Sequence, residues 1–279
     1  MKHKKRNPDS IPTFLYHYQA LGEPNGALEQ RLRTTLSEKT IYCSRFDQLN
    51  DPFENNPRFD VEDFHAFAKT PAGAKFLAGL SKAPPQQTQQ LRAALEKDPV
   101  TRAKVIDGIR LKTKLLANER WRIYCLSATP TNNLLWAHYG AGHSGICLPF
   151  DTRNFDFSSI FRVRYFESVP RLRLGGTEDD WAVEFLLKKS SHWEYEQEYR
   201  ILARPSAYAA PFRNLAAVSN GHILKLPNGA LRTVIVGCRG DLQRVRQILS
   251  ECKETAVSVI RAVADMHSTD VTIPELADL

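Results

Sequence analysis

The chain lacks the cysteine pattern of a metal-binding or disulfide-bonded protein. It has five cysteines in 279 residues, an odd number, and no two of them form a Cys-x-x-Cys pair. Most structural zinc sites and thioredoxin-type redox sites need such pairs. The five are widely scattered, at Cys43, Cys125, Cys147, Cys238 and Cys252. We therefore expect reduced, buried cysteines, which are typical of cytoplasmic proteins.

Long apolar runs are missing as well. The basic first ten residues lack the apolar core of a signal peptide, and no later stretch is apolar enough to cross a membrane. We expect a cytoplasmic protein that does not enter membranes, with residues 1–10 as a basic, disordered tail.

Charge is only mildly unbalanced, since 38 Lys and Arg residues face 31 Asp and Glu residues. This surplus is compatible with a polyanionic partner such as nucleic acid but does not require one. With 42% hydrophobic residues, the chain can bury a sizeable core. We predict one α+β domain over residues 1–279, with a mixed, largely antiparallel central sheet and a helical insertion.

The order of apolar patterns supports this fold class. Alternating or continuous β-type runs predict strands at 13–18, 40–44, 121–127, 145–150, 161–165, 221–226, 231–237, 257–260 and 271–273. Helical spacing predicts helices at 26–36, 132–139, 177–187 and 241–252. Residues 61–119 are rich in Ala, Leu, Lys and Gln, and Pro-containing breaks divide them into roughly three helices. This segment is the predicted insertion.

The stretch 190–204 alternates most strictly between charged and aromatic or apolar residues. A strand over this stretch is predicted to carry a polar row on one face, formed by Glu194, Glu196, Glu198 and Arg200. Carboxylates two residues apart raise the cost of ionising one another unless a cation or a substrate lies near them. We expect Arg162 and Arg164 to supply counter-charges.

Two other polar groups accompany this row. Asn50, Asp51 and Glu54 lie in a turn-rich loop, and His138 and Tyr139 end a short helix before a glycine-rich turn. Because polar side chains in apolar surroundings usually have one another as partners, we expect these groups and the Glu196/Glu198 face to converge on one cleft.

Four segments together resemble the bacterial domain-of-unknown-function family 2971. They are Leu15-Tyr-His-Tyr18, Phe46 through Glu54, Trp136-Ala-His-Tyr139 with 145–151, and Trp193 through Arg200. Residues 234–237 fit the family's usual C-terminal strand. The resemblance covers nearly the whole chain but implies no activity.

A second resemblance is to the ADP-ribosyltransferase fold, in which an early strand carries His or Arg, a later one an aromatic or Ser, and a late one a catalytic Glu. It implies an NAD-dependent transferase, acting as a toxin or phage-defence effector on a nucleic acid or protein acceptor. His17, Tyr42 or Ser44, and Glu196 or Glu198 match those places. Glu198, Glu196 and His138 are therefore our candidate catalytic residues. The candidate NAD-binding residues are His17, Tyr42, Ser44, Asn50, Asp51, Tyr139 and Arg200. A carboxylate can stabilise the oxocarbenium ion of glycosidic cleavage, and an aromatic face can hold the leaving ring.

Two alternatives stay open. One is a metal-dependent nucleic-acid-processing enzyme that holds Mg²⁺ through Asp51, Glu54, Glu196 and Glu198. The other is a non-enzymatic sensor or binding module whose polar residues form a buried structural network. Carboxylates that have no arginine as an ion-pair partner favour the metal site. Carboxylates that are paired with arginines favour an anionic ligand or a structural network.

Overall fold

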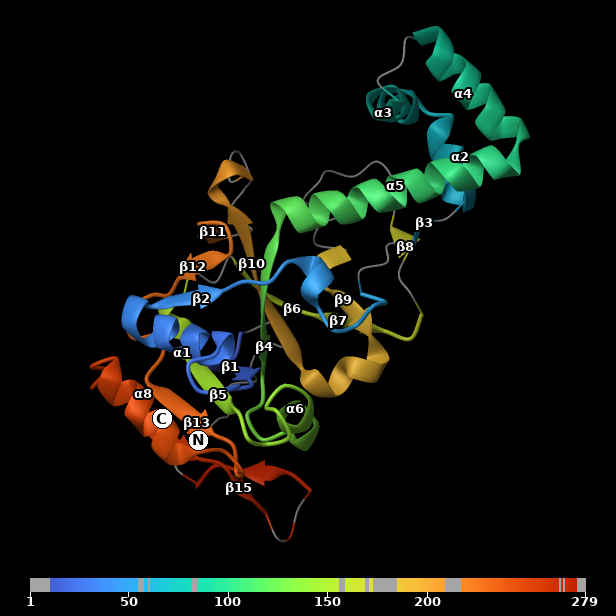
Figure 1. The fold of residues 1–279 in the computed structure, drawn as a ribbon. Helices are drawn as coiled ribbons and strands as arrows, with labels where there is room; N and C mark the ends of the chain where they lie inside the picture. Colours follow the sequence, from blue (N-terminus) through green and yellow to red (C-terminus); the bar gives the residue numbers. More distant parts are fainter. Residues whose placement is uncertain are drawn as a thin grey trace, which may run out of the picture. The chain divides into compact units, whose positions relative to one another are not determined.

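The computed structural model describes residues 11–54, 58–59, 61–81, 85–155, 159–168, 171–172, 185–208, 217–265, 267 and 269–274. The predicted tail 1–10 and most of the predicted helix 177–187 lie outside these residues. The chain forms two compact units (Figure 1). The sheet unit comprises Met1–Ser44, Arg122–Val163 and His192–Leu279, and the helical unit comprises Arg45–Trp121 and Arg164–Ser191. The prediction of one domain therefore stays a prediction.

The sheet unit is built on one large sheet that gathers strands from both ends of the chain. Its strands are β1 (Phe14–Gln19), β4 (Arg122–Ser127), β5 (Ile146–Asp151), β6 (Ile160–Arg162), β10 (Glu198–Pro205), β11 (Ala217–Ser219), β13 (Thr233–Val236) and β14 (Ser258–Arg261). The strand order is β11-β10-β4-β1-β5-β13-β14, with β6 also paired to β10. Pairing is antiparallel except at β10–β11 and β13–β14. The predicted α+β class with a mixed, largely antiparallel sheet is confirmed.

Side-chain alternation assigns each residue of the central strands to one face of this sheet. In the β1–β5 register, Leu15 lies opposite Phe150 and His17 lies opposite Leu148. Leu15, Leu148 and Phe150 belong to the larger apolar core, whereas Tyr16 and Tyr18 belong to a second, smaller core. A shift of one residue would exchange the two sets, so the burial pattern fixes the register.

Helices α1 (Ala27–Glu38) and α8 (Leu242–Glu251) cover the face with the larger core (Figure 1). Their buried stripes, Leu32 and Leu36 on α1 and Val245 and Ile248 on α8, pack in that core. Asp241 begins α8 by accepting a hydrogen bond from the backbone of Arg244 at 3.0 Å. We call this side of the sheet the α1/α8 face.

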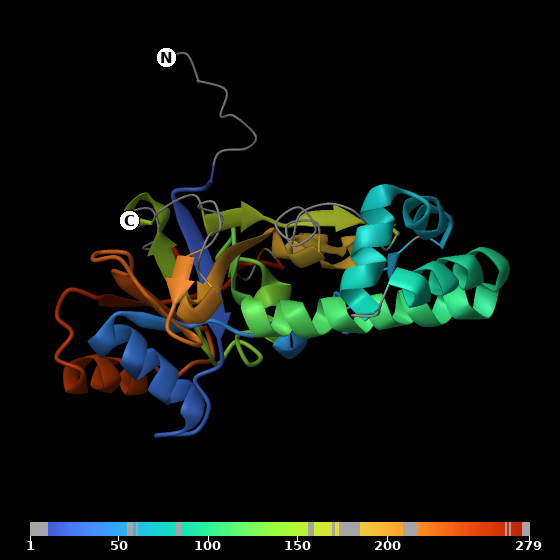
Figure 2. The same ribbon diagram turned by 90° about the horizontal axis from the view of Figure 1, so that it is seen from above.

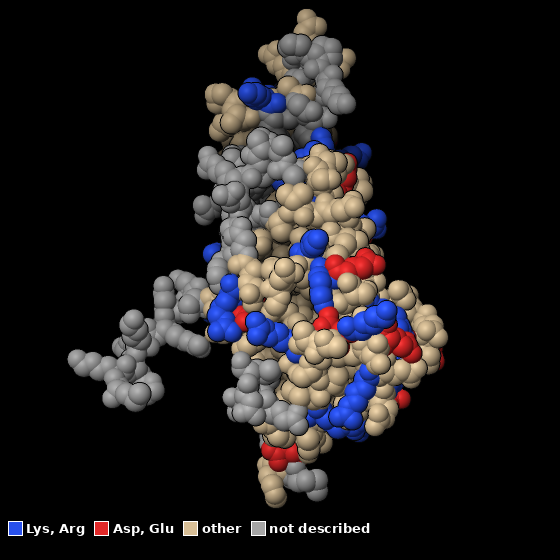
Figure 3. Space-filling model, turned by 90° about the vertical axis from the view of Figure 1, so that its left-hand side faces the viewer, with Lys and Arg blue, Asp and Glu red and all other residues tan. Residues whose placement is uncertain are grey.

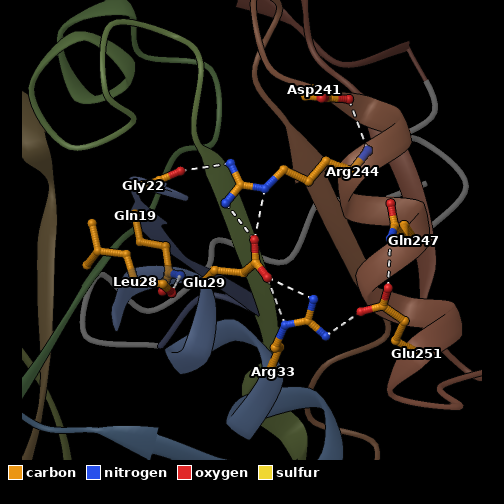
Figure 4. A network of polar contacts seen from close by, with 9 residues as sticks. All are labelled: Gln19, Gly22, Leu28, Glu29, Arg33, Asp241, Arg244, Gln247 and Glu251. Atoms are coloured by element: carbon orange, nitrogen blue, oxygen red, sulfur yellow. Dashed lines mark hydrogen bonds and ion pairs between the residues drawn. The ribbon is translucent and has the colours of Figure 1, made fainter. Parts of the chain in front are cut away.

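A buried carboxylate joins the two helices on this face (Figure 4). Glu29 of α1 is only 2% exposed, and its two oxygens accept from Arg33 at 2.8 Å and from Arg244 of α8 at 2.9 Å. Arg33 also pairs with Glu251 at 2.7 Å, and Arg244 donates to the carbonyl of Gly22 at 2.7 Å. The network therefore ties α1 to α8 and to the end of the loop that precedes α1.

The opposite side of the sheet is covered by the short helix α6 (Asn133–His138), and we call it the α6 face. Leu135 and Trp136 of α6 pack there with Tyr16 and Tyr18. The Trp136 indole is fully buried and donates to the carbonyl of Pro130 at 2.8 Å. This second core is small, and charged residues lie close to it.

Two predicted strand regions differ from the observed structure. Residues 161–165 form no single strand, because β6 ends at Arg162 and β7 (Arg164–Phe166) pairs with β9 (Lys188–Ser190) in the helical unit. Residues 221–226 contain β12 (Ile223–Lys225), which pairs with β2 (Thr40–Tyr42) and not with β13. A further small sheet joins β15 (Val263–Ala264) to β16 (Val271–Thr272).

The helical unit contains α2 (Val61–Ala68), α3 (Pro71–Ser81), α4 (Pro85–Lys97) and α5 (Pro99–Arg120). Figure 2 shows the long α5 beside the shorter helices, which share a core formed by Phe64, Ala68, Leu77, Leu95 and Ile109. The prediction of a helical segment at 61–119 is confirmed. Four helices replace the predicted three because α2 already ends at Ala68 and α3 begins at Pro71, as a proline disfavours a helical residue before it.

Smaller elements complete the helical unit. They are the 3₁₀ turn η1 (Phe46–Gln48) and the strand pair β3 (Arg58–Phe59) and β8 (Arg171–Leu172). Within the described part of the chain, no helix combines the length and apolar character needed to cross a membrane. All five cysteines are free thiols.

Candidate functional site

The predicted continuous strand over 190–204 is wrong in its first half. Residues Ser191–Glu196 form a 3₁₀ turn, η4, and β10 begins only at Glu198. Between them, Gln197 has a left-handed backbone with φ of 46°. A left-handed residue ends the strict side-chain alternation of a strand, so Glu194, Glu196 and Glu198 do not form one row. Glu194 is exposed, whereas Glu196 is buried.

Side chains from two neighbouring elements hold this turn in place. The hydroxyl of Ser127, at the end of β4, donates to the carbonyl of Glu196 at 2.6 Å. The amide of Asn132 donates to the carbonyl of Tyr195 at 3.1 Å, and its oxygen caps α6 by accepting from the backbone of Leu134 at 2.9 Å. Sequence reasoning gave neither Ser127 nor Asn132 a role. The signal for Asn132 was its position before a helix, where Asn is a preferred N-cap.

Four rings from α6, the residue after it and η4 lie close to one another, and we call them the aromatic cluster: His138, Tyr139, Trp193 and Tyr195. The ring centre of His138 lies 6.4 Å from each of the other three, and those of Trp193 and Tyr195 lie 6.0 Å apart. His138 is exposed and the other three are partly exposed. A surface of this kind can stack against a planar ligand ring.

A buried carboxylate lies in contact with the cluster. Glu196 is 4% exposed, and its Oε1 accepts a hydrogen bond of 2.6 Å from the phenol of Tyr139. Short O–H···O⁻ contacts of this length are charge-assisted and strong. Tyr139 is partly exposed, so this hydrogen bond joins the buried Glu196 carboxylate to a ring of the aromatic cluster.

The next carboxylate along the chain is paired with a cation of its own. Glu198 and Arg200 are 3% and 0% exposed, and the guanidinium donates to both carboxylate oxygens, at 2.7 and 3.0 Å. Glu198 lies opposite Ser127, which lies opposite Tyr16, so the pair belongs to the α6 face. Arg200 is thus engaged by a carboxylate of its own strand.

Of the two arginines expected as counter-charges, Arg162 does not serve in this way, and the role expected of Arg164 stays a prediction because it lies in the other unit. Arg162 of β6 is exposed and lies opposite Tyr199, so it shares the α1/α8 face with that tyrosine rather than the α6 face with Glu198. Arg164 belongs to the helical unit. The strand partner Arg200 neutralises Glu198 instead, which the spacing of two residues along one strand face allows.

The sheet itself separates His17 from these carboxylates. His17 shares the α1/α8 face with Leu15, where its ring stacks on Tyr124 with centres 4.2 Å apart. Its Nδ1 lies 2.8 Å from the carbonyl of Cys125, an arrangement in which the nitrogen donates. Burial lowers the pKa of His17 to about 4, against the hydrogen bond that His17 donates to the Cys125 carbonyl, and the charge of Arg31 lowers it further. His17 and Glu196 therefore cannot line one cleft.

The other early candidates also lie away from the α6 face. Tyr42 of β2 is stacked between the guanidinium of Arg31, 4.4 Å from the ring centre, and the imidazole of His222, at 4.9 Å between ring centres. Ser44 forms a two-way backbone bridge with Ile123, with both hydrogen bonds at 2.8 Å. Ser44 thus has an evident structural role.

The loop 50–54 belongs to the helical unit, so its convergence with the aromatic cluster stays a prediction. Asn50 is exposed, whereas Asp51 is buried and accepts from the backbone of Phe53 at 2.8 Å. Glu54 forms a buried ion pair with Lys189 at 3.0 Å. Among the described residues, no three His, Cys, Asp or Glu side chains are grouped in a way that could hold a metal ion.

Comparison of the chain with protein-family models, with curated proteins and with solved structures found no match in any of the three.

Proposed function

We propose that the protein is an ADP-ribosyltransferase-like enzyme that transfers ADP-ribose from NAD, with the aromatic cluster and Glu196 as its reaction site. The observation that carries this proposal is the buried Glu196 carboxylate held by the phenol of Tyr139. Two kinds of group needed for glycosidic cleavage, a carboxylate and flat rings, thereby lie side by side.

The residues present fit the two ends of the nicotinamide riboside group. Trp193, Tyr195 and His138 offer ring faces to a planar base, and Glu196 offers a carboxylate to a ribose hydroxyl. Bound NAD supplies a glycosidic bond whose cleavage leaves positive charge on the ribose. Nicotinamide leaves with the electron pair of that bond, and the acceptor's nucleophile forms the new bond to the ribose carbon and loses its proton. Glu196 stabilises the positive charge in between, and Tyr139 holds the carboxylate in position.

Glu198 takes a positioning role in this proposal rather than the leading catalytic one expected from the sequence. Its carboxylate is bound on both oxygens by Arg200, so it fixes the start of β10 directly after the turn that carries Glu196. A fixed strand end limits the movement of that turn, and catalytic groups need such support.

Such a transferase would act in the cytoplasm, where its free thiols stay reduced, as a toxin or phage-defence effector. The acceptor implied by the resemblance is a nucleic acid or a protein. On the side that carries α1 and α8, away from the aromatic cluster, Lys and Arg atoms lie next to Asp and Glu atoms (Figure 3).

The metal-dependent reading has less support. Glu54 is paired with Lys189 and Glu198 with Arg200, so two of its four expected ligands already have dedicated cations. The non-enzymatic reading predicts the same pairs as structural contacts, so it is the alternative that an experiment must separate from catalysis.

The test compares Glu196→Gln with Glu194→Gln, two identical changes in one turn, of which only the first touches the buried carboxylate. The full-length variants are assayed for NAD hydrolysis and for melting temperature with and without NAD. We expect Glu196→Gln to lower turnover by roughly 10²-fold or more, and Glu194→Gln to leave it unchanged.

A transferase role for Glu196 would be refuted by NAD turnover that is absent from the wild-type protein, or equal in the two variants. A binding module would instead show a melting temperature raised by NAD without turnover. Tyr139→Phe adds a check, since it keeps the ring and removes the hydrogen bond that positions Glu196.

A further inference from the structure

The sheet unit has a pocket that no part of the proposed reaction uses. It has a volume of about 360 Å³ and opens between the C-terminal end of α1, the turn 227–230 and the segment after α8. Its apolar lining includes the buried residues Leu226, Ala230 and Val257. Pockets that hold small molecules range from roughly 300 to 1,000 Å³ and are mostly apolar, so this one suits a ligand of modest size.

Three charged residues also line this pocket: Lys39, Arg232 and Glu254. The ammonium of Lys39 is paired with Glu254 and also donates to the carbonyl of Leu36 at 2.7 Å. These contacts neutralise most of its charge. One positive charge, that of Arg232, is left in excess.

Arg232 has donors to spare. Its Nε makes one long hydrogen bond, 3.4 Å, to the carbonyl of Gly229, and no salt bridge of Arg232 is found among the described residues. The pKa of Asp151 is lowered mainly by the hydrogen bond from its ion-pair partner Arg153 and to a lesser extent by the charge of Arg232. Gly229 has a left-handed backbone with φ of 74°, and a side chain there would come within 3.4 Å of the guanidinium. Glycine suits this position because of its left-handed backbone, and the turn lies within contact distance of the guanidinium.

We propose that this pocket binds a small monocarboxylate with an apolar body, whose carboxylate pairs with Arg232 while the body lies on Leu226, Ala230 and Val257. A guanidinium offers two parallel donors that match a planar carboxylate. A dianionic phosphate is disfavoured, because the Glu254 carboxylate is at the same pocket and only one cation is unpaired. The site is separate from the aromatic cluster and does not depend on NAD chemistry.

The experiment titrates the full-length protein with phenylacetate, isovalerate and the neutral 2-phenylethanol, followed by calorimetry and ligand-observed NMR. Phenylacetate and isovalerate test two apolar bodies with one carboxylate, and 2-phenylethanol removes the charge. We expect at least one carboxylate to bind about tenfold or more tightly than the alcohol.

Single substitutions test which residues of the pocket bind the carboxylate and the apolar body. Arg232→Gln should weaken carboxylate binding about tenfold and leave the alcohol unchanged, and Ala256→Phe, at an exposed lining position, should weaken both. The matched control is Arg246→Gln, an exposed arginine of α8 that does not line the pocket, and it should bind as the wild type does. Melting curves check that each variant is folded.

The proposal is overturned if neither carboxylate binds at concentrations up to about 10 mM, a limit far weaker than most specific sites. It is also overturned if Arg232→Gln and Arg246→Gln bind phenylacetate equally well, because the carboxylate then has another partner. Neither outcome bears on Glu196 or on NAD turnover.

Discussion

The buried carboxylates on the two faces of the central sheet have different hydrogen-bond and ion-pair partners. On the α1/α8 face, Glu29 is held by two arginines from two helices, and each arginine has a further acceptor (Figure 4). On the α6 face, Glu198 has an arginine from its own strand, while Glu196 is bound by a phenol at the edge of a partly exposed aromatic cluster.

Both carboxylates join elements of the fold, but Glu29 does so through two guanidinium groups and Glu196 through a phenol of the aromatic cluster. Glu29 connects α1, α8 and a loop, which accounts for its burial without any ligand. Glu196 connects to Tyr139 and lies one residue before a left-handed backbone position, a local strain that proteins often retain at functional sites. Burial alone did not distinguish the two, since both are under 5% exposed.

The largest expected effect comes from breaking the Glu198–Arg200 pair. Glu198→Gln leaves the guanidinium of the fully buried Arg200 without its counter-charge, and the loss of one member of a buried pair typically costs about 3–5 kcal/mol of unfolding free energy. Urea unfolding of Glu198→Gln beside Glu194→Gln measures it. A variant that loses less than about 1 kcal/mol would show that Arg200 is stabilised by other contacts.

The acid sensitivity of the α1/α8 face gives the next effect. The pKa of His17 is lowered from 6.5 to about 4, so the unfolded chain binds a proton more readily than the folded protein between these values. The free energy of unfolding that depends on neutral His17 is therefore fully present above pH 6.5. It falls by up to roughly 3 kcal/mol as the pH drops toward 4. His17→Phe keeps a ring against Tyr124 but cannot titrate, so its stability should vary less with pH in this window. Equal slopes for wild type and His17→Phe would contradict the burial of a neutral imidazole.

A third change tests the helix network. Burial raises the pKa of Glu29, but hydrogen bonds from Arg244 and Arg33 outweigh it and leave the pKa below its ordinary value of 4.5. The stability from this group is therefore present above pH 4.5 and is lost as the pH falls through the lowered pKa. Glu29→Gln should cost about 1–3 kcal/mol at pH 7 and less at pH 3. A cost that stays constant with pH would mean that the ionised form of Glu29 adds nothing.

The sheet was predictable from sequence because its strands are apolar on both faces or alternate cleanly. β1, β5 and β13 lie where the apolar runs placed them, and α1 and α8 follow their buried stripes. The turn 191–196 was not predictable in this way. Its alternation of Trp, Glu and Tyr satisfies the pattern of a strand, while the contacts that make it a 3₁₀ turn come from Ser127 and Asn132, some 60 residues away.

The candidate site was predictable only in part, because residue type can be read from the sequence but strand pairing cannot. His138, Tyr139 and Glu196 were all singled out by residue type, and they lie together. His17 was expected at the same site from the resemblance to the ADP-ribosyltransferase fold, and alternation along one strand does not tell which face of the sheet another strand's residues share. That information comes from the pairing of β1 with β4 and of β4 with β10.

The smallest expected effect tests whether the left-handed residue matters for the α6 face in particular. Gln197, with φ of 46°, precedes β10, and Lys253, with φ of 55°, follows α8 on the other side of the sheet. A side chain in this conformation costs about 1 kcal/mol relative to glycine, so at each position the Ala variant should be about 1 kcal/mol less stable than the Gly variant.

Glycine also allows a turn to adopt more backbone conformations. At Gln197 this freedom loosens the turn that carries Trp193, Tyr195 and Glu196, so Gln197→Gly should lower NAD turnover several-fold, whereas Lys253→Gly should not. Unfolding curves and turnover of the four variants give both quantities, and equal turnover in Gln197→Gly and Lys253→Gly would remove the strained residue from the proposed site.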